Sequence, residues 1–178
     1  MQRIVKHTKT GHYPQLHNLG SASLYFDEIL SLKHIKLFED FSNDEIEALC
    51  RYMTCYAAST GSRVLTEGHE GDFLLLVLTG KVAVLKRNEF GVSYYLGVAE
   101  PGTMLGEISL INGTPYFASC DAIVPTDFAV LSRASLNLVL AQIPRLGNKL
   151  LFILLQLMAT RLCDSSRQSF RSNLYSYV

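Results

Sequence analysis

The stretch that decides the fold of this chain reads Pro101-Gly102-Thr103-Met104-Leu105-Gly106-Glu107-Ile108-Ser109-Leu110-Ile111-Asn112-Gly113-Thr114-Pro115-Tyr116-Phe117-Ala118-Ser119-Cys120. It opens on a Pro-Gly turn, which is followed by a glycine, an acid and a short run with helical character. A second turn from Asn112 to Pro115 ends that run, and apolar residues resume at Phe117. The stretch therefore predicts a turn, a short helix, a second turn and a strand.

The spacing of this stretch resembles the phosphate-binding cassette of the cyclic nucleotide-binding domain family, which includes catabolite-activator-like sensors and protein kinase A regulatory subunits. In that family the core reads Phe-Gly-Glu-Leu-Ala-Leu, followed after a short loop by Pro-Arg-Ala-Ala-Thr. This chain has Leu-Gly-Glu-Ile-Ser-Leu over 105–110 and Pro-Tyr-Phe-Ala-Ser over 115–119. The resemblance implies that a nucleotide site would use Gly106, Glu107, Ile108, Ser109, Tyr116, Phe117, Ala118 and Ser119.

A cassette of this kind combines backbone amides, a carboxylate and a cation. The start of the short helix offers unpaired N–H groups and a positive dipole end to an anion. Gly106 lets the backbone come close to the ligand. By resemblance, the Glu107 carboxylate accepts a hydrogen bond from the ribose hydroxyl, and the family's arginine pairs with the cyclic phosphate.

Tyr116 occupies the position of that arginine in this chain. Removing one partner of a buried charge pair costs about 3–5 kcal/mol, which is roughly two to four orders of magnitude in affinity. No Lys or Arg occurs from Gly102 to Ser132, so a replacement cation has to come from elsewhere, for example Lys86 or Arg87. Phe117, where the family usually has a small residue, predicts a narrower pocket. A filled pocket and some form of nucleotide binding stay open as alternatives.

The rest of the chain predicts a mainly β domain with flanking helices. Short β-rich runs alternate with glycine turns, which is typical of a barrel, roll or sandwich. The resemblance covers roughly residues 35–165 and implies an antiparallel β-roll of jelly-roll type with N-terminal helices and a long C-terminal helix. The expected parts are a flexible arm over 1–22, the domain over 23–168 with its roll at 57–133 and C-terminal helices at 134–168, and a tail over 169–178.

The expected helices flank the roll on both sides in sequence. One starts at Ser23 or Asp27 and runs to about Leu37, and a second follows the capping box formed by Ser42 and Glu45. The last expected helix, at the C-terminal end of the domain, contains an apolar run that is too short to span a bilayer. That run is apolar nearly all round, so both of its faces should be covered. We expect one face on the roll and the other against a second copy in a two-fold dimer through helix 146–168, with a lid lying only on its own roll as the alternative.

Composition and motifs argue against other classes of protein. The chain of 178 residues has 16 basic and 16 acidic residues, so it lacks the basic field of a nucleic-acid or anionic-membrane binder. Its four cysteines form no Cys-x-x-Cys pair and predict buried thiols in a reducing cytosol. The polar N-terminus carries no signal sequence, so we expect a cytoplasmic location. His69 alone in the β region does not make a cupin-type metal site.

A DNA-binding unit is also not expected, because too few residues follow the long helix to build a helix-turn-helix. The arginines at 161, 167 and 171 are interpreted as a solvated helix end. We therefore expect a non-catalytic regulatory module that requires no cofactor and signals through its C-terminal helix to a partner protein. Ordinary cyclic AMP or cyclic GMP binding is expected to be weakened or lost. The alternatives are a sensor for a cyclic nucleotide or cyclic dinucleotide, bound through backbone amides, Glu107 and Ser119, or the sensor part of a Crp-like transcription regulator.

Overall fold

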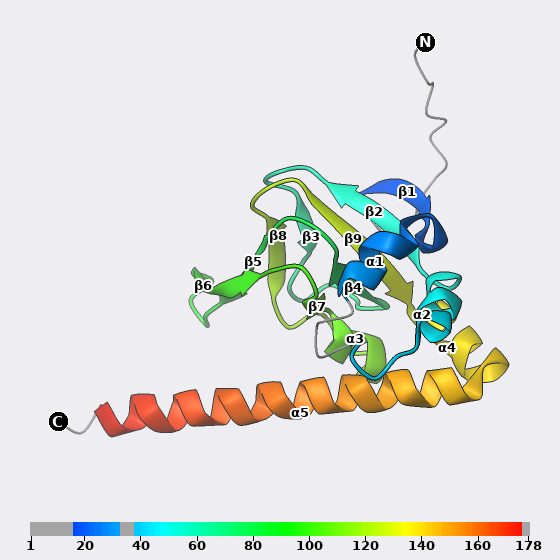
Figure 1. Cartoon of the computed structure of the whole chain (residues 1–178). Helices are drawn as coiled ribbons and strands as arrows, with labels where there is room; N and C mark the ends of the chain where they lie inside the picture. Colours follow the sequence, from blue (N-terminus) through cyan, green and yellow to red (C-terminus); the bar gives the residue numbers. More distant parts are fainter. Residues whose placement is uncertain (1–15, 33–37, 176–178) are drawn as a thin grey trace, which may run out of the picture.

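The computed structural model describes residues 16–32 and 38–175, with side chains described up to residue 166. Within these residues the chain forms two antiparallel sheets with helices gathered on one side, and the long helix α5 lies beneath them (Figure 1). This is the expected mainly β architecture with flanking helices.

The larger sheet has the strand order β1-β2-β9-β4-β7, and the smaller has the order β3-β8-β5-β6. Neighbouring strands are antiparallel in both. The strands of the larger sheet are β1 (His17–Ser21), β2 (Thr54–Ala58), β9 (Thr126–Ser132), β4 (Phe73–Val77) and β7 (Met104–Leu105). Those of the smaller sheet are β3 (Arg63–Leu65), β8 (Ser119–Ala122), β5 (Val82–Arg87) and β6 (Ser93–Ala99).

Strand β4 separates the two parts of the core. All five of its residues are buried, as the continuous apolar run predicts. Because successive side chains point to opposite faces of a sheet, Leu75 and Val77 join the cluster inside the roll, whereas Leu74 and Leu76 join the cluster under the helices. The roll and its helical cover therefore share one strand as their common wall.

Regular structure on the N-terminal side begins earlier than the sequence suggests, with a strand before the expected helices. β1 pairs with β2, so residues 17–21, expected to belong to the loose arm, are part of the larger sheet. A 3-10 turn, η1 (Ala22–Tyr25), and helix α1 (Phe26–Ser31) follow, while the expected end of this helix at 33–37 lies outside the described residues. α2 (Asn43–Cys50) starts at the predicted capping box, in which the Glu45 N–H donates to Ser42 Oγ at 3.2 Å and the Ser42 N–H donates to Glu45 Oε2 at 2.8 Å.

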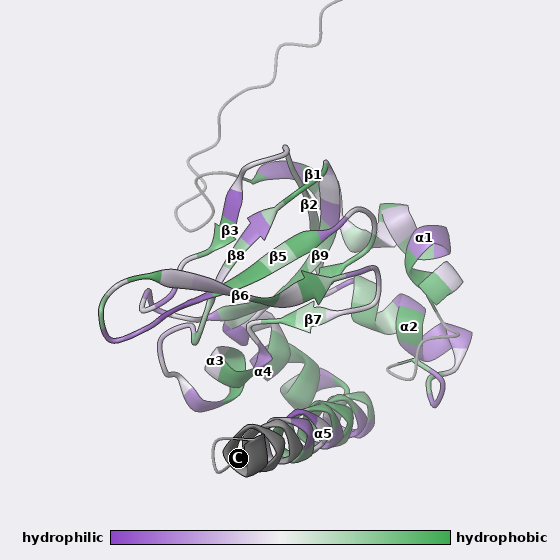
Figure 2. Ribbon diagram, turned by 90° about the vertical axis from the view of Figure 1, so that its left-hand side faces the viewer, coloured by the Kyte–Doolittle hydropathy of each residue, from purple (hydrophilic) through white to green (hydrophobic). Residues whose placement is uncertain are grey.

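Two helices follow the roll, α4 (Arg133–Gln142) and α5 (Pro144–Tyr175). They pack closely, because a Cβ added at Gly147 of α5 would lie 2.8 Å from a methyl carbon of Leu140 on α4. α5 has 32 residues and runs beyond the expected end at 168. Figure 2 shows it end on, below α3 and α4.

Helix α5 extends beyond the apolar run on which our expectation about membranes rested. Its segment Pro144–Ser166 is long and apolar enough to cross a bilayer by length and composition, contrary to the estimate from the shorter apolar run. A mostly buried core helix passes the same test, whereas 28% of the apolar window of α5 is buried. Here Leu146, Leu150 and Leu154 are buried against the rest of the domain.

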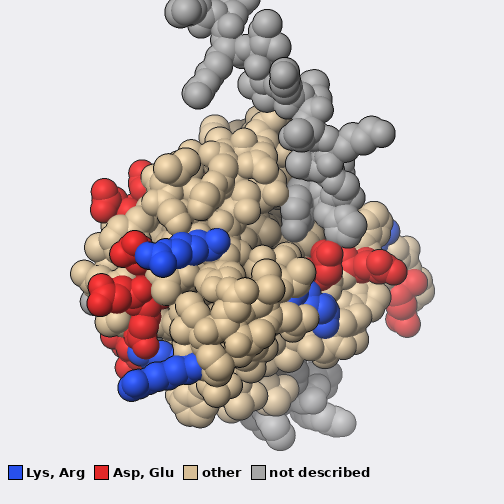
Figure 3. All heavy atoms as spheres, turned by 90° about the vertical axis from the view of Figure 1, so that its right-hand side faces the viewer, with Lys and Arg blue, Asp and Glu red and all other residues tan. Residues whose placement is uncertain are grey.

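Charged residues do not gather into one basic field on the face shown in Figure 3. Lys and Arg side chains lie there among Asp and Glu. One mixed pair near the start of α5 joins Lys149 Nζ to Glu45 Oε2 at 2.6 Å. This face agrees with the zero formal charge of the sequence.

Two glycines with the same backbone conformation provide a stability test of the roll. Gly80 and Gly91 have φ of +77° and +78°. A Cβ at Gly80 would lie 2.4 Å from the Pro125 carbonyl oxygen, whereas a Cβ at Gly91 would meet nothing within 4 Å. We expect Gly91→Ala to cost about 1 kcal/mol from the left-handed backbone alone. Gly80→Ala should cost about 1–3 kcal/mol more because of the steric clash. Urea denaturation measures both, and equal losses would contradict the close approach at Gly80.

Candidate functional site

The expected short helix is present as α3 (Glu107–Asn112). Gly106 precedes it in a left-handed conformation, with φ of +83°, and a Cβ there would lie 2.9 Å from the Phe73 carbonyl oxygen. Only glycine meets both constraints without strain. Gly113, also left-handed, ends the helix at the predicted second turn.

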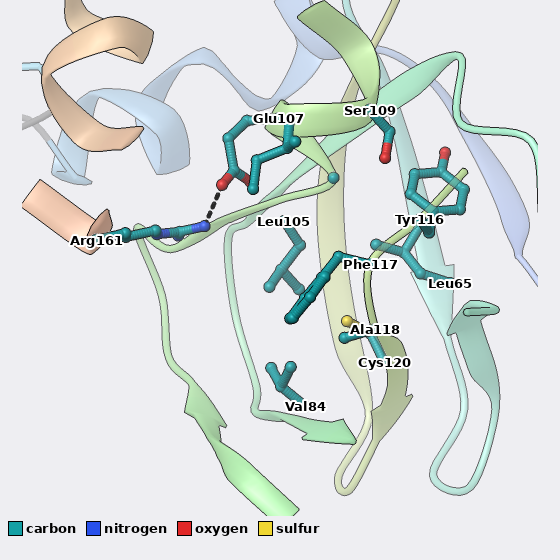
Figure 4. A pocket seen from close by; sticks show the side chains of 12 residues that line it. Leu65, Val84, Leu105, Glu107, Ser109, Tyr116, Phe117, Ala118, Cys120 and Arg161 are labelled. Atoms are coloured by element: carbon teal, nitrogen blue, oxygen red, sulfur yellow. Dashed lines mark hydrogen bonds and ion pairs between the residues drawn. The ribbon is translucent and has the colours of Figure 1, made fainter. Parts of the chain in front are cut away.

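A cavity of about 110 Å³ lies in front of α3 (Figure 4). All of the predicted site residues line it except Ser119, whose buried hydroxyl accepts a hydrogen bond from the Glu67 N–H at 3.0 Å instead. The other lining residues are Leu65, Val84, Leu105, Cys120 and Arg161. The cavity wall is therefore largely apolar, with Glu107 and Arg161 as its charged groups.

Tyr116 is part of the packed wall of this cavity. Its side chain is buried, and its hydroxyl donates to the Phe73 carbonyl oxygen at 3.2 Å. The ring packs edge-on against the Phe73 ring, with the centroids 5.5 Å apart. A Cβ added at Gly71 or Gly106 would lie only 3.1 or 3.0 Å from the Tyr116 ring. The phenol thus fills the space between two glycine-containing segments, where the family places a ligand-binding arginine by resemblance.

Glu107 has a partner that the sequence did not indicate. Its side chain is only 2% exposed and forms an ion pair with Arg161 of α5, drawn as a dashed line in Figure 4. A second nitrogen of the same guanidinium donates to the Met104 carbonyl oxygen at 2.7 Å. The interpretation of Arg161 as part of a solvated helix end is therefore wrong. It lies well inside the 32-residue helix and supplies the cation of the cavity.

Of the two cations named from the sequence, Lys86 reaches the edge of the cassette. Its ammonium group donates to the Phe117 carbonyl oxygen at 2.7 Å, pairs with Glu67 at 2.8 Å and lies 4.2 Å from the centre of the Phe117 ring. The backbone N–H of Arg87 donates to the other oxygen of Glu67 at 2.9 Å. The Lys86 ion pair and the Arg87 N–H hold the pKa of the Glu67 carboxyl below its usual value. Lys86 is thus committed to Glu67 and Phe117, and it does not line the cavity.

Arg133, the first basic residue after the cassette, supports α3 from its far end. Its guanidinium donates to the Ser109 carbonyl oxygen at 2.6 Å and to the Gly71 carbonyl oxygen at 3.2 Å. A cation on the last carbonyl groups of a helix is favourable because of the helix dipole. Sequence reasoning missed this contact, since α4 and α3 come together only in the fold.

In the part of the chain that is described, we find neither a metal-binding group of side chains nor an activated cysteine nucleophile at Cys120. Its His, Cys, Asp and Glu side chains form no group of three that could hold a metal ion. Cys120 on β8 is buried, and burial raises the pKa of its thiol to about 12. The prediction of buried thiols is confirmed for Cys50, Cys55 and Cys120 and is wrong for Cys163, which is exposed on α5.

Thiol reactivity tests this packing. Burial also raises the pKa of Cys50 to about 11 and that of Cys55 to about 12, whereas Cys163 is exposed on α5. At pH 8 the buried thiols are almost wholly protonated, and the thiolate is the reactive form. We expect titration with a chromogenic disulfide reagent to modify Cys163 rapidly and the three buried thiols only after denaturation. Cys163→Ser should abolish the rapid phase, and a rapid phase that persists in this variant would contradict the burial of the other three thiols, Cys50, Cys55 and Cys120.

Comparison with known proteins agrees with this geometry. The family model described as "Cyclic nucleotide-binding domain" matches residues 57–142. A solved cyclic nucleotide-binding domain from Methylobacillus flagellatus is 48% identical, with a TM-score of 0.80, covering 92% of this chain and 94% of that one.

Two curated regulators also match. The CRP-like cAMP-activated global transcriptional regulator of Mycobacterium tuberculosis is 29% identical over 128 residues, covering 72% of this chain and 56% of the regulator. The cAMP-dependent protein kinase regulatory subunit of Yarrowia lipolytica is 30% identical over 102 residues, covering 57% of this chain and 26% of the subunit. This chain thus spans about half or less of these curated relatives. The cassette, the two-sheet roll and the near full-length match to a solved domain together show that the chain belongs to the cyclic nucleotide-binding domain family.

Proposed function

We propose that the chain is a non-catalytic, cytoplasmic regulatory module of this family, in which binding of ordinary cyclic AMP or cyclic GMP is weakened or lost. The observation that carries the proposal is the packing of Tyr116. Its buried ring and its hydrogen bond to Phe73 place a neutral phenol where the family uses a guanidinium. The module passes its signal to a partner protein through α5.

Charge supports this proposal. Among the residues that line the cavity, Arg161 is the only Lys or Arg, and its guanidinium already pairs with Glu107. The site therefore offers a cyclic phosphate no net positive charge from its side chains. A desolvated anion without a cation is costly, at about 3–5 kcal/mol for a broken buried pair.

Space supports it as well. Small-molecule sites usually have volumes of roughly 300–1,000 Å³, whereas this cavity measures about 110 Å³. Phe117 lines the cavity together with Tyr116. The Lys86 ammonium group lies over the Phe117 ring at the edge of the cavity. Both rings take up space on the cavity wall that a smaller side chain would leave open.

A functional cyclic nucleotide or cyclic dinucleotide sensor is the second candidate, because the backbone of the cassette is retained. α3 starts after a left-handed Gly106, and Glu107 lines the cavity as the resemblance requires. A variant of this second candidate is that the chain is the sensor part of a transcription regulator. The similarity to the CRP-like regulator of Mycobacterium tuberculosis supports this variant.

Helix α5 is proposed to be the output of the module and the contact to a second copy. Phe152, Leu155 and Leu162 are 60%, 58% and 69% exposed. Together with the exposed Ala159 they recur at spacings of three, four and three residues, the pattern of a helix–helix seam. Burying such a stripe is favourable at roughly 25 cal/mol per Å² of apolar surface. We therefore propose a two-fold dimer through residues 146–168.

Restoring the missing cation tests the proposed function. Tyr116→Arg should raise cyclic AMP affinity by about 100-fold or more, because it returns a charge pair worth about 3–5 kcal/mol. Calorimetric titration with cyclic AMP, cyclic GMP and a cyclic dinucleotide measures the change. Micromolar cyclic AMP binding by the unaltered chain would contradict the proposal and favour the sensor.

A matched variant separates charge from shape in this titration. Tyr116→Met removes the ring and adds no cation, so we expect a much smaller gain in cyclic AMP affinity from it than from Tyr116→Arg. If Tyr116→Met gains as much affinity as Tyr116→Arg, the phenol excludes nucleotide by its bulk and the charge argument fails. Circular dichroism confirms that both variants stay folded.

The dimer is tested on the exposed stripe. Leu155→Glu places a charge in the middle of the stripe and should convert the dimer to a monomer in sedimentation equilibrium, because a buried unpaired charge is unfavourable. Thr160→Glu adds the same charge at an exposed position off the stripe and should leave the dimer intact. A monomeric unaltered chain at high protein concentration would contradict the dimer.

A further inference from the structure

Strand β6 forms one edge of the smaller sheet and extends away from the body of the domain (Figure 1). In the part of the chain that the structure describes, it pairs with β5 alone. The Val92 carbonyl oxygen accepts a hydrogen bond from the Asn88 N–H at 3.0 Å, so the backbone of Val92 faces β5. Backbone groups of successive residues point to alternate sides of a strand. The N–H and C=O groups of Ser93 and Tyr95 therefore point to the open edge.

The side chains of this edge are apolar, and they are exposed on both faces of the strand. They are Phe90, Val92, Tyr94, Tyr95, Leu96 and Val98. Natural edge strands are commonly protected from pairing by charges, prolines or bulges. The edge has a register shift against β5, but residues 90–99 contain neither a charge nor a proline. It is therefore a surface on which a further strand can pair.

The sequence of the edge is symmetric in character about Tyr94. Counted outward from Tyr94 in both directions, the second residue is apolar, the third is glycine and the fourth is apolar. The corresponding pairs are Val92 and Leu96, Gly91 and Gly97, and Phe90 and Val98. If two copies of the strand run antiparallel about a two-fold axis at Tyr94, these apolar side chains lie opposite one another. The outward backbone groups of Ser93 then meet those of the partner's Tyr95.

We propose that β6 is a docking edge for a second copy of this chain, which adds its own β6 antiparallel about a two-fold axis at Tyr94. The two smaller sheets then become one continuous sheet. Such a contact is isologous, because the same patch of each copy meets itself. Main-chain hydrogen bonds and cross-strand apolar pairs supply the affinity. Because residues 90–99 are uncharged, the pairing brings no like charges together along this stretch.

The area of the edge determines the strength of this contact. Its exposed apolar side chains offer on the order of 100 Å² each, since a fully buried aromatic side chain contributes roughly 150–250 Å². Two copies then bury on the order of 1,000 Å², at the lower limit of specific interfaces. We therefore expect the β6 contact to form at higher protein concentration than the α5 dimer and to join such dimers. A chain without the α5 contact stays monomeric until that concentration is reached.

Disulfide cross-linking tests the pairing and its register. Tyr94→Cys is made in chains that carry Cys163→Ser and Leu155→Glu, which remove the exposed native thiol and the proposed α5 contact. Tyr94 lies opposite its own copy in a non-hydrogen-bonded pair, where the Cα atoms are about 4.5 Å apart. This distance is within the range of a disulfide. We expect mild oxidation at high protein concentration to link most of this variant into dimers.

Leu96→Cys in the same background is the matched control. In the proposed register the two copies of residue 96 are offset by four residues, or about 13 Å along the strand, which is beyond the reach of a disulfide. The control should give at least about tenfold less linked dimer. Absence of linked dimer in the folded Tyr94→Cys variant would overturn the proposal. Equal linking in both variants would overturn it as well, because it would indicate random collision.

A charge at the edge tests the association without cross-linking. Tyr94→Lys places two ammonium groups opposite each other, so it should raise the dissociation constant of the Leu155→Glu chain by about tenfold or more in sedimentation equilibrium. Leu24→Lys adds the same charge at an exposed apolar residue of η1 and should leave this constant unchanged. Circular dichroism confirms that the variants stay folded. An unchanged constant in Tyr94→Lys, or a Leu155→Glu chain that is monomeric at every concentration, would overturn the docking edge and leave the proposed α5 dimer unaffected.

Discussion

A carboxylate that is almost fully buried needs a cation, and this requirement organises the site. Glu107, at 2% exposure, meets it with Arg161 from a helix more than fifty residues further along the chain. An uncompensated buried charge costs several kcal/mol. The pair connects α5 to the cassette, and it leaves the cavity with balanced charges. The positions of α3 and the long helix depend on each other through this contact.

The second constraint is the replacement of a cation by a packed aromatic ring. Tyr116 is held by Phe73 on β4, a strand whose side chains build both parts of the core. An arginine at this position would need a ligand or a carboxylate, whereas a phenol is satisfied by one carbonyl oxygen. The buried phenol therefore has its hydrogen-bond partner within the protein. An apolar, narrow cavity follows from the same change, since Tyr116 and Phe117 both line it.

Much of the fold was predictable because local chemistry and tertiary structure agree. Ser42 and Glu45 form the expected capping box, β4 is buried on both faces, and α3 lies between its two left-handed glycines. The start of the domain was less predictable. Residues 17–21 have a polar, glycine-containing sequence, and they become a strand because β2 offers an unpaired edge.

The sequence by itself determined the family and the roll, because the stretch 101–120 resembles the family's phosphate-binding cassette. Turns, caps and apolar periodicity, which act between residues close together in the chain, predicted the individual helices and strands. Only the tertiary structure decided that Arg161, Arg133 and Lys86 contact the cassette and that Ser119 turns toward Glu67. A long charged side chain reaches several neighbours in a fold, and which one it pairs with depends on burial. Burial is a property of the packed domain, so no spacing of residues along the chain encodes it.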